Sequence, residues 1–343
     1  MKIDTGYFRD LYKRTDNRVV TDNRLKPYCQ NGENIMSREK SNHYNSFISK
    51  GWYDFGNILD KKKCKELYYN ILRKRPLTKN IFYQSKNEFK QMGRFKNYSP
   101  GASKHNFLLD QNIDLSFIED SKLFKDNVGK IMGNNYKIMK KTIIRSVPFN
   151  RFPEWIEKET EDYGRPNLNP YIKDEFQDIQ YFLNADLHQD MTRGKKFATF
   201  YIYLGDVKRK DSALRVLENS HIHGATPYPH YLRTSKREKD MWFYTSLTGE
   251  HLKCREICLE GTAGRVACWH GLTLHGSYYN FSHKPRISLR YLIQSNSKHL
   301  KNSIFGKCCK NIKGKMVEKN QKLARLDRRK DGTFIRTGML VGP

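Results

Sequence analysis

The spacing of hydrophobic residues changes along the chain from a helical to a strand-like period. After Asp60, a residue type suited to an N-cap, apolar side chains fall on one helical face and Lys and Arg occupy the other until Pro76. The spacing Ser116-x-x-Glu119 is typical of a capping box and predicts a second helix that ends near Gly133. Short apolar runs separated by turn residues predict strands. These are Phe47–Gly56, Tyr136–Val147, Ile179–Leu183, Phe197–Leu204, Ala213–Leu217, Gly264–Cys268 and Ile287–Ile293.

Helices in the first half and many short strands in the second half predict a mainly β fold with flanking helices, of the α+β class. A jelly roll that carries a helical flank fits this order of elements. We expect residues 46–297 to form a single domain and residues 1–45 to be a polar extension. Residues 298–343 form a basic tail, whose centre, 311–330, has the spacing of a basic helix.

The chain is strongly basic, and its charge bears on its partners. Its 343 residues include 64 Lys and Arg against 36 Asp and Glu, a net charge of +28. Such a chain attracts polyanions, so a protein that binds nucleic acid or modifies nucleobases is the alternative function. Base stacking needs aromatic side chains among the basic ones, and the tail has only Phe305 and Phe334.

Cysteine usage and the absence of targeting signals predict a cytoplasmic protein. The seven cysteines include no CxxC pair, which argues against a zinc ribbon, and their odd number argues against a disulfide framework. The N-terminus lacks the apolar region of a secretory signal. No stretch approaches the roughly 18–20 apolar residues of a membrane span.

Candidate chemistry begins with a His-x-Asp pair. His188 and Asp190 alternate along a strand, so both side chains point to one face and can chelate one ion. His275 is the third candidate ligand; His270 competes with it, although packing is the simpler role for His270. Two imidazoles and one carboxylate can cap one face of an octahedral iron(II) ion and leave the other positions open for O2 and a co-substrate.

An arginine follows the distal histidine at a suitable distance. Arg286, Ser288 and Arg290 share one face of the last predicted strand. A guanidinium grips a carboxylate through two parallel hydrogen bonds, and a nearby hydroxyl adds a third. Arg286 with Ser288 therefore suits the distal carboxylate of 2-oxoglutarate, with Arg290 as the alternative.

These motifs resemble the phytanoyl-CoA dioxygenase-type iron(II)/2-oxoglutarate oxygenases. The resemblance covers roughly Ser46 to Ile293. It rests on the following motifs: the region 51–75, His188-Gln189-Asp190, Ser212–His221, and His275-Gly276-Ser277 followed by Asn280, Ser282 and Arg286. Within Ser212–His221, Glu218-Asn219 stands where the family usually has Pro-Gly, and Asn tolerates the left-handed backbone of such a turn.

The resemblance implies a double-stranded β-helix that holds iron through His188, Asp190 and His275. Ser277 and Arg286 would bind 2-oxoglutarate, with Tyr201 and Gln180 as further contacts. The implied reaction consumes O2, abstracts hydrogen from a C–H bond and releases succinate and CO2. Because Asp190 is present rather than the small residue of related halogenases, the implied product is hydroxylated, desaturated or cyclised.

Hints to the substrate are few. Arg145, Arg193 and Arg215 are candidates to line the mouth of the site, which favours a small, anionic, carboxylate-bearing metabolite. We expect a lid in the Pro-rich segment 150–173 or in the aromatic-rich segment 224–250.

Overall fold

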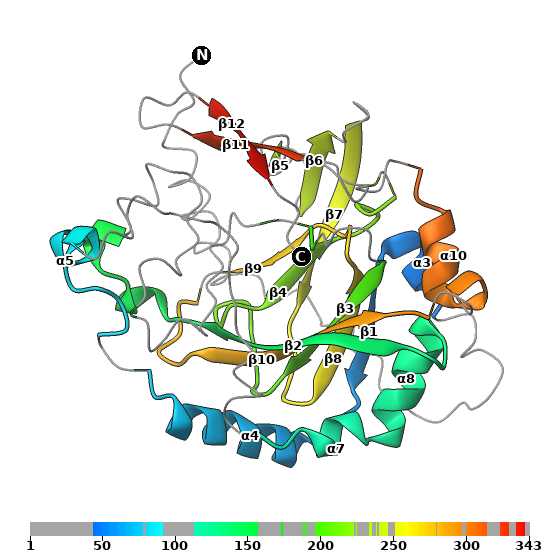
Figure 1. Ribbon diagram of the computed structural model, residues 1–343, viewed down its shortest axis with the longest axis horizontal. Helices are drawn as coiled ribbons and strands as arrows, with labels where there is room; N and C mark the ends of the chain where they lie inside the picture. Colours follow the sequence, from blue (N-terminus) through cyan, green and yellow to red (C-terminus); the bar gives the residue numbers. More distant parts are fainter. Residues whose placement is uncertain are drawn as a thin grey trace. The chain divides into compact units, whose positions relative to one another are not determined.

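Antiparallel sheets contain most of the strands that the sequence predicts (Figure 1). The first sheet has the order β1-β8-β3-β10-β2 and the second the order β5-β6-β7-β4-β9. The first sheet consists of β1 (Trp52–Asn57), β2 (Lys137–Ser146), β3 (Phe197–Tyr203), β8 (Arg265–His270) and β10 (Arg286–Gln294). The second consists of β4 (Leu214–Leu217), β5 (Arg233–Thr234), β6 (Met241–Thr245), β7 (His251–Leu259) and β9 (His275–Ser277).

The structure is a computed structural model, and the residues that it describes lie in the unit Ser41–Pro343. They are 44–77, 80–91, 113–156, 173, 187, 189–190, 196–222, 224, 233–234, 238, 240–245, 251–278, 280–296, 300–313, 323–328 and 334–339. Within these ranges no helix is both long and apolar enough to cross a bilayer.

The chain passes repeatedly between the two sheets. After β3 it enters the second sheet as β4, and after β7 it returns to the first sheet as β8. It then crosses once more to β9 and back to β10. These crossings place β9 and β10, which are neighbours in sequence, in different sheets, so residues close in sequence approach the space between the sheets from two sides.

Strand alternation gives the first sheet two different faces. On β10, Ile287, Leu289, Tyr291 and Ile293 are fully buried in a cluster with helical residues. The intervening Arg286, Ser288 and Arg290 point to the opposite face. A second apolar cluster lies on that face and includes residues of both sheets: Ile144, Tyr201 and Trp269 from the first sheet, with Leu214, Val216 and Leu259 from the second. The inner faces of the two sheets therefore pack against each other.

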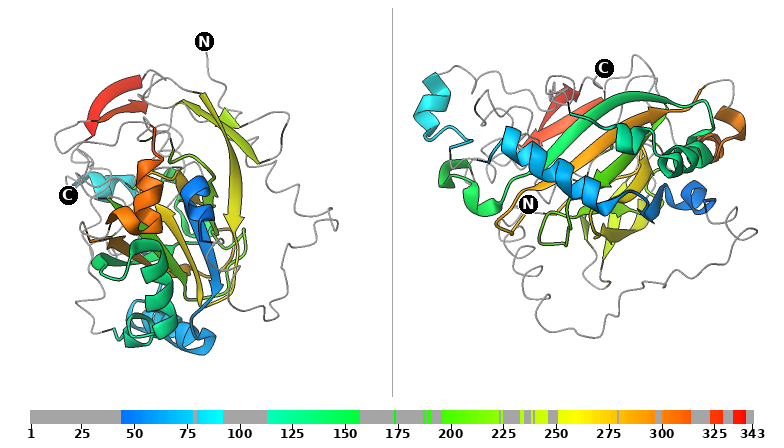
Figure 2. Two further views of the ribbon diagram at one scale, coloured as in Figure 1. Left: turned by 90° about the vertical axis from the view of Figure 1, so that its right-hand side faces the viewer. Right: turned by 90° about the horizontal axis from the view of Figure 1, so that it is seen from below.

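Helices cover the outer face of the first sheet (Figure 2). They are α3 (Ser46–Lys50), α4 (Lys61–Lys74), α7 (Ser116–Glu119), α8 (Lys122–Met132) and α10 (Ile304–Lys310); α5 (Lys86–Gln91) packs in a separate apolar cluster, and two short 3-10 helices span Phe149–Arg151 and Leu300–Asn302. Asp60 caps α4 as predicted, since its side chain accepts a hydrogen bond of 2.8 Å from the backbone N–H of Lys63.

The predicted mainly β fold with flanking helices is confirmed, and the predicted strands at 136–147, 197–204, 213–217, 264–268 and 287–293 each correspond to an observed strand. The strand predicted at Ile179–Leu183 lies outside the described residues. The segment Phe47–Gly56 is not one strand. Helix α3 ends at Lys50, and Gly51, with a left-handed φ of +77°, is its C-cap before β1 begins at Trp52.

Two further predictions are wrong in detail. The helix before Gly133 begins not at Ser116 but at Ser121, whose hydroxyl accepts from the N–H of Phe124 at 3.3 Å. The basic segment 311–330 does not form one helix, because β11 (Leu323–Arg328) pairs with β12 (Phe334–Met339) as an antiparallel hairpin. Tertiary pairing with a later segment overrides the local helical period.

Part of the predicted tail is integrated into the core. Phe305 and Cys308 of α10 are fully buried in the cluster that α3, α8 and the first sheet form. The segment 224–250, predicted as a lid, contains β5 and β6, and β6 pairs with β7. The sequence alone does not distinguish the aromatic residues of a strand from those of a lid, because both occur as short aromatic runs.

Candidate active site

Asp190 and His275 come from distant parts of the sequence and meet in the structure. Asp190 Oδ2 lies 3.4 Å from His275 Nε2. The other ring nitrogen of His275, Nδ1, lies 2.9 Å from the backbone carbonyl oxygen of Thr273. A carbonyl oxygen only accepts, so Nδ1 carries the proton in the neutral ring and Nε2 keeps its lone pair on the side of Asp190. Metal-ligating histidines are held in this way.

Neighbouring groups fix the carboxylate of Asp190. The hydroxyl of Thr199, on β3, donates to Oδ2 at 3.0 Å, and Arg290 Nη1, on β10, lies 3.5 Å from Oδ1. At Gly271 a Cβ would come within 2.8 Å of the backbone carbonyl oxygen of Asp190, so only glycine permits this close approach. No sequence motif marks Thr199, although it lies only nine residues after Asp190.

Gln189 connects the Asp190 segment to the loop before His275. Its side-chain amide donates to the carbonyl oxygens of Gly224 at 3.0 Å and Leu272 at 2.6 Å. Gln189 is buried, and it precedes Asp190 directly. In an extended chain its side chain points away from that of Asp190, so one residue anchors the backbone while the next presents its carboxylate. The sequence motif contains Gln189 but by itself indicates no role for it.

Arg286 is a buried cation with unused donors. It is 3% exposed, and its Nη1 donates to the carbonyl oxygen of Ser212 and, at 3.0 Å, to the hydroxyl of Ser277. Its Nε and Nη2 are buried and find no hydrogen-bond partner among the described residues, and the hydroxyls of Ser288 and Tyr201 are in the same condition. The Arg286 guanidinium lies 5.6 Å from the centre of the Tyr201 ring. Unsatisfied buried donors are costly, so this group of side chains is arranged for an anionic ligand.

One small cavity is lined by some residues of each group. Its lining includes Tyr201, Ser277 and Arg290 together with His275 and four less polar positions, Ile144, Leu214, Trp269 and Gly276. The Trp269 ring lies 4.7 Å from the His275 ring. Tyr203 joins the sheets beside the cavity: its hydroxyl donates to the carbonyl oxygen of Leu259 at 2.7 Å and accepts from the N–H of Leu214 at 2.9 Å, and burial raises its pKa.

The competing histidine, His270, lies on the other face of β8. Its ring stacks on Phe305 at 5.1 Å, and its Nδ1 accepts from the backbone N–H of Leu272 at 3.1 Å. Burial, followed by the neighbouring His221, lowers the pKa of His270 well below its usual value, so the ring is neutral. The fold thus separates His270 from Asp190 and uses it as a packing residue.

Several predicted residues are elsewhere or cannot be placed. His188, Gln180 and Arg193 lie outside the described residues. Arg145 faces the helices, where its Nη1 donates to the carbonyl oxygen of Arg75 at 2.7 Å, and Arg215 forms an ion pair of 3.2 Å with Glu256. Neither Arg145 nor Arg215 lines the cavity described above. The described part of the chain has no cluster of three His, Cys, Asp or Glu side chains able to hold a metal ion; it supplies two of the three predicted iron ligands.

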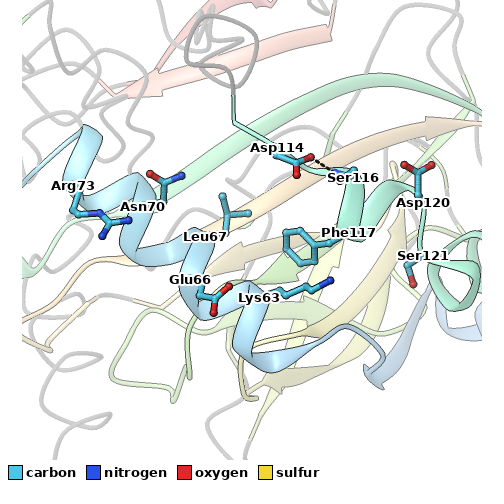
Figure 3. A pocket seen from close by; sticks show the side chains of 10 residues that line it. All are labelled: Lys63, Glu66, Leu67, Asn70, Arg73, Asp114, Ser116, Phe117, Asp120 and Ser121. Carbon is cyan, nitrogen blue, oxygen red and sulfur yellow. Dashed lines mark hydrogen bonds between the residues drawn. The ribbon is translucent and has the colours of Figure 1, made fainter.

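A wider surface hollow of about 850 Å³ lies between α4 and the segment that contains α7 (Figure 3). Its charged lining residues are of both signs: Lys63, Glu66 and Arg73 on α4 face Asp114 and Asp120. Asp114 is engaged locally, since its carboxylate accepts from the N–H of Ser116 at 2.8 Å, which lowers the pKa of Asp114. This hollow presents no constellation of catalytic groups.

Comparison with known proteins gave no match to any protein-family profile and none to a curated protein sequence. Solved structures do show a likeness. AviO1 from Streptomyces viridochromogenes Tue57 is 10% identical with a TM-score of 0.39, covering 77% of this chain and 98% of its own. EctD from S. alaskensis is 12% identical with a TM-score of 0.39, covering 79% and 82%.

A third structure is the non-haem α-ketoglutarate-dependent epimerase SnoN from nogalamycin biosynthesis, which is 11% identical with a TM-score of 0.40 and covers 74% of this chain and 81% of its own. Because all three TM-scores lie below 0.5, we base the assignment of function on the residues of this chain alone.

Proposed function

We propose that this chain is an iron(II)- and 2-oxoglutarate-dependent dioxygenase, with its two sheets forming a double-stranded β-helix within residues 46–297. The observation that carries the proposal is a small cavity lined by His275 and Ser277: the Asp190 carboxylate lies beside His275, and the buried Arg286, whose Nε and Nη2 have no partner among the described residues, donates to Ser277. A carboxylate and a neutral imidazole suit iron(II), and a guanidinium flanked by hydroxyls suits a dicarboxylic co-substrate.

The donor set fits the metal. Asp190 and the Nε2 of His275 would hold iron, with His188 supplying the third ligand by its spacing from Asp190. Thr199 and Arg290 keep the Asp190 carboxylate in one orientation, and Thr273 keeps the His275 ring in one tautomer. Bound iron, with 2-oxoglutarate and O2, supplies the oxidation that removes hydrogen from a C–H bond.

The pocket beside the metal fits the co-substrate. Nε and Nη2 of Arg286 would grip the distal carboxylate, while the hydroxyls of Ser277, Ser288 and Tyr201 complete its hydrogen bonds. Gln180 stays a predicted contact. Trp269, Leu214 and Ile144 form apolar walls that exclude water. The products are succinate, CO2 and a small metabolite that has been hydroxylated, desaturated or cyclised; we predict a cytoplasmic location.

The experiment that tests the proposal is an anaerobic titration of metal-free protein with iron(II) and 2-oxoglutarate. A keto acid that chelates active-site iron gives a weak visible charge-transfer band, which needs no knowledge of the substrate. We expect the band in the wild type and in His283→Ala, which alters an exposed histidine. We expect no band in His188→Ala or His275→Ala. A folded wild-type protein without the band overturns the proposal and favours salt-dependent polyanion binding.

A further inference from the structure

A second cation, Arg290, points into the cavity from the same strand as Arg286. It lines the cavity with His275, and its side chain is 12% exposed. Nη1 lies 3.5 Å from Asp190 Oδ1, while Nε is buried without a hydrogen-bond partner among the described residues. Arg286 serves the co-substrate in the proposed function, so Arg290 is a buried donor that the co-substrate does not explain.

Strand β2 adds two polar groups beside Arg290. Thr142 lies directly opposite Arg290 in the antiparallel register, and Lys140 lies opposite Leu292. Residues opposite each other share a face, and Ile144, two positions further along β2, lines the cavity. The Thr142 hydroxyl is buried and without a partner in the described part of the chain, and Lys140 is partly buried and forms no ion pair there.

The charge in this corner is unbalanced. Among the described residues, Lys140 and Arg290 carry two positive charges near one carboxylate, that of Asp190. Burial lowers the pKa of Lys140, the positive charge of Arg290 lowers it further, and Asp190 raises it. The carboxylate of Asp190 is also the group assigned to the metal. Two partly desolvated cations with an unpaired hydroxyl between them are stabilised by an added anion.

We propose that Arg290, Thr142 and Lys140 form the subsite for a carboxylate of the primary substrate, separate from the carboxylate site at Arg286. This inference rests on the proposed function and names the substrate class, which is a small organic carboxylate. Because Arg290 contacts Asp190, which is assigned to the metal, a substrate carboxylate bound to Arg290 would lie close to the metal. We therefore expect the oxidised carbon to lie only a few bonds from the carboxylate of the substrate. The cationic groups that favour an anion are therefore Arg290 and Lys140 rather than Arg145 or Arg215.

The test uses two acid and amide pairs as probes: benzoate with benzamide, and 4-methylpentanoate with its primary amide. Binding to the full chain, loaded anaerobically with saturating iron(II) and 2-oxoglutarate, is measured by calorimetry and by the shift of the charge-transfer band. We expect each carboxylate to bind at least tenfold more tightly than its amide. Arg290→Gln should abolish this preference, and Arg290→Lys, which keeps the charge, should retain part of it.

Controls separate this inference from the proposed function. Lys137→Gln removes a charge from an exposed position of β2 and should keep the full carboxylate preference, whereas Lys140→Gln should reduce it. A preference that persists in Arg290→Gln, or equal binding of acids and amides, overturns the subsite. If Arg290→Gln weakens 2-oxoglutarate as strongly as Arg286→Gln does, Arg290 belongs to the co-substrate site and the subsite is wrong. A missing band in the wild type instead overturns the proposed function.

Discussion

Replacing Arg286 by glutamine is the most direct perturbation of the co-substrate site. The guanidinium is buried, and Nε and Nη2 have no hydrogen-bond partner among the described residues. Both are available to a carboxylate as a bidentate pair. A hydrogen bond to a charged group contributes about 1.5–3 kcal/mol, so losing two costs about 3–6 kcal/mol of binding free energy. That is a weakening of 2-oxoglutarate binding by a factor of roughly 10² to 10⁴.

Stability should respond much less than affinity. Within the described part of the chain, Nε and Nη2 have no hydrogen-bond partner, so the substitution removes the Nη1 hydrogen bonds to Ser212 and Ser277. Arg286→Lys keeps a positive charge but not the planar fork, so we expect an intermediate loss of about 10- to 100-fold, equivalent to one hydrogen bond.

The assay is the anaerobic charge-transfer titration with 2-oxoglutarate at fixed iron(II), with chemical denaturation to verify that each variant is folded. Lys137→Gln controls for the loss of one positive charge at an exposed position. A folded Arg286→Gln protein that binds 2-oxoglutarate with wild-type affinity would refute the assignment of Arg286 and, with it, the argument from unpartnered donors.

Three further predictions concern stability and metal binding. Gly51→Ala should lower the free energy of unfolding by about 2–5 kcal/mol, because φ is +77° and the new Cβ would lie 2.2 Å from His221 Nδ1. Gly56→Ala, at φ +71° with open space around it, should lower it by only about 1–2 kcal/mol. Equal losses in chemical denaturation would contradict the predicted clash with His221. Thr199→Val removes the hydroxyl bound to the Asp190 carboxylate and should weaken iron(II) binding about 10- to 100-fold in a direct titration; unchanged affinity would exclude this supporting role. Burial raises the pKa of the Cys64 thiol from 9.0 to about 12. The thiol therefore loses its proton at lower pH in the unfolded chain than in the folded one, and the free energy of unfolding should fall as pH rises from about 9 toward 12. The urea midpoints at pH 8 and pH 10.5 should differ less in Cys64→Ala than in the wild type.

The elements most accurately predicted from sequence were those with strong local signals. Asp60 was predicted as an N-cap because its side chain acts on an amide three residues away. The shared face of Arg286, Ser288 and Arg290 follows from the alternation of any strand. By contrast, the start of α8 was misplaced at Ser116, because two serines precede the same apolar run and only the folded chain shows that Ser121 is the cap.

The choice between His270 and His275 shows the same division within the site. Sequence motifs favoured His275 but left both possible, since the two residues are only five positions apart. The fold separates them by placing His270 in β8 against Phe305 and His275 in β9 of the other sheet beside Asp190. No sequence motif marks Thr199 or Thr142, because the fold brings Thr199 to Asp190 and the register of β2 with β10 places Thr142 opposite Arg290.

By itself, the sequence determined the residue types of the proposed chemistry, because strand alternation and short spacings are local properties of the chain. It specified which side chains of β10 share a face and which motif carries the carboxylate. Only the tertiary structure decided which of these side chains meet, because the register of β10 with β2 and β3 is a non-local pairing. Burial in that arrangement leaves donors of Arg286 and Arg290 without partners among the residues that the structure describes, and these unsatisfied donors distinguish a candidate site from a list of candidate residues.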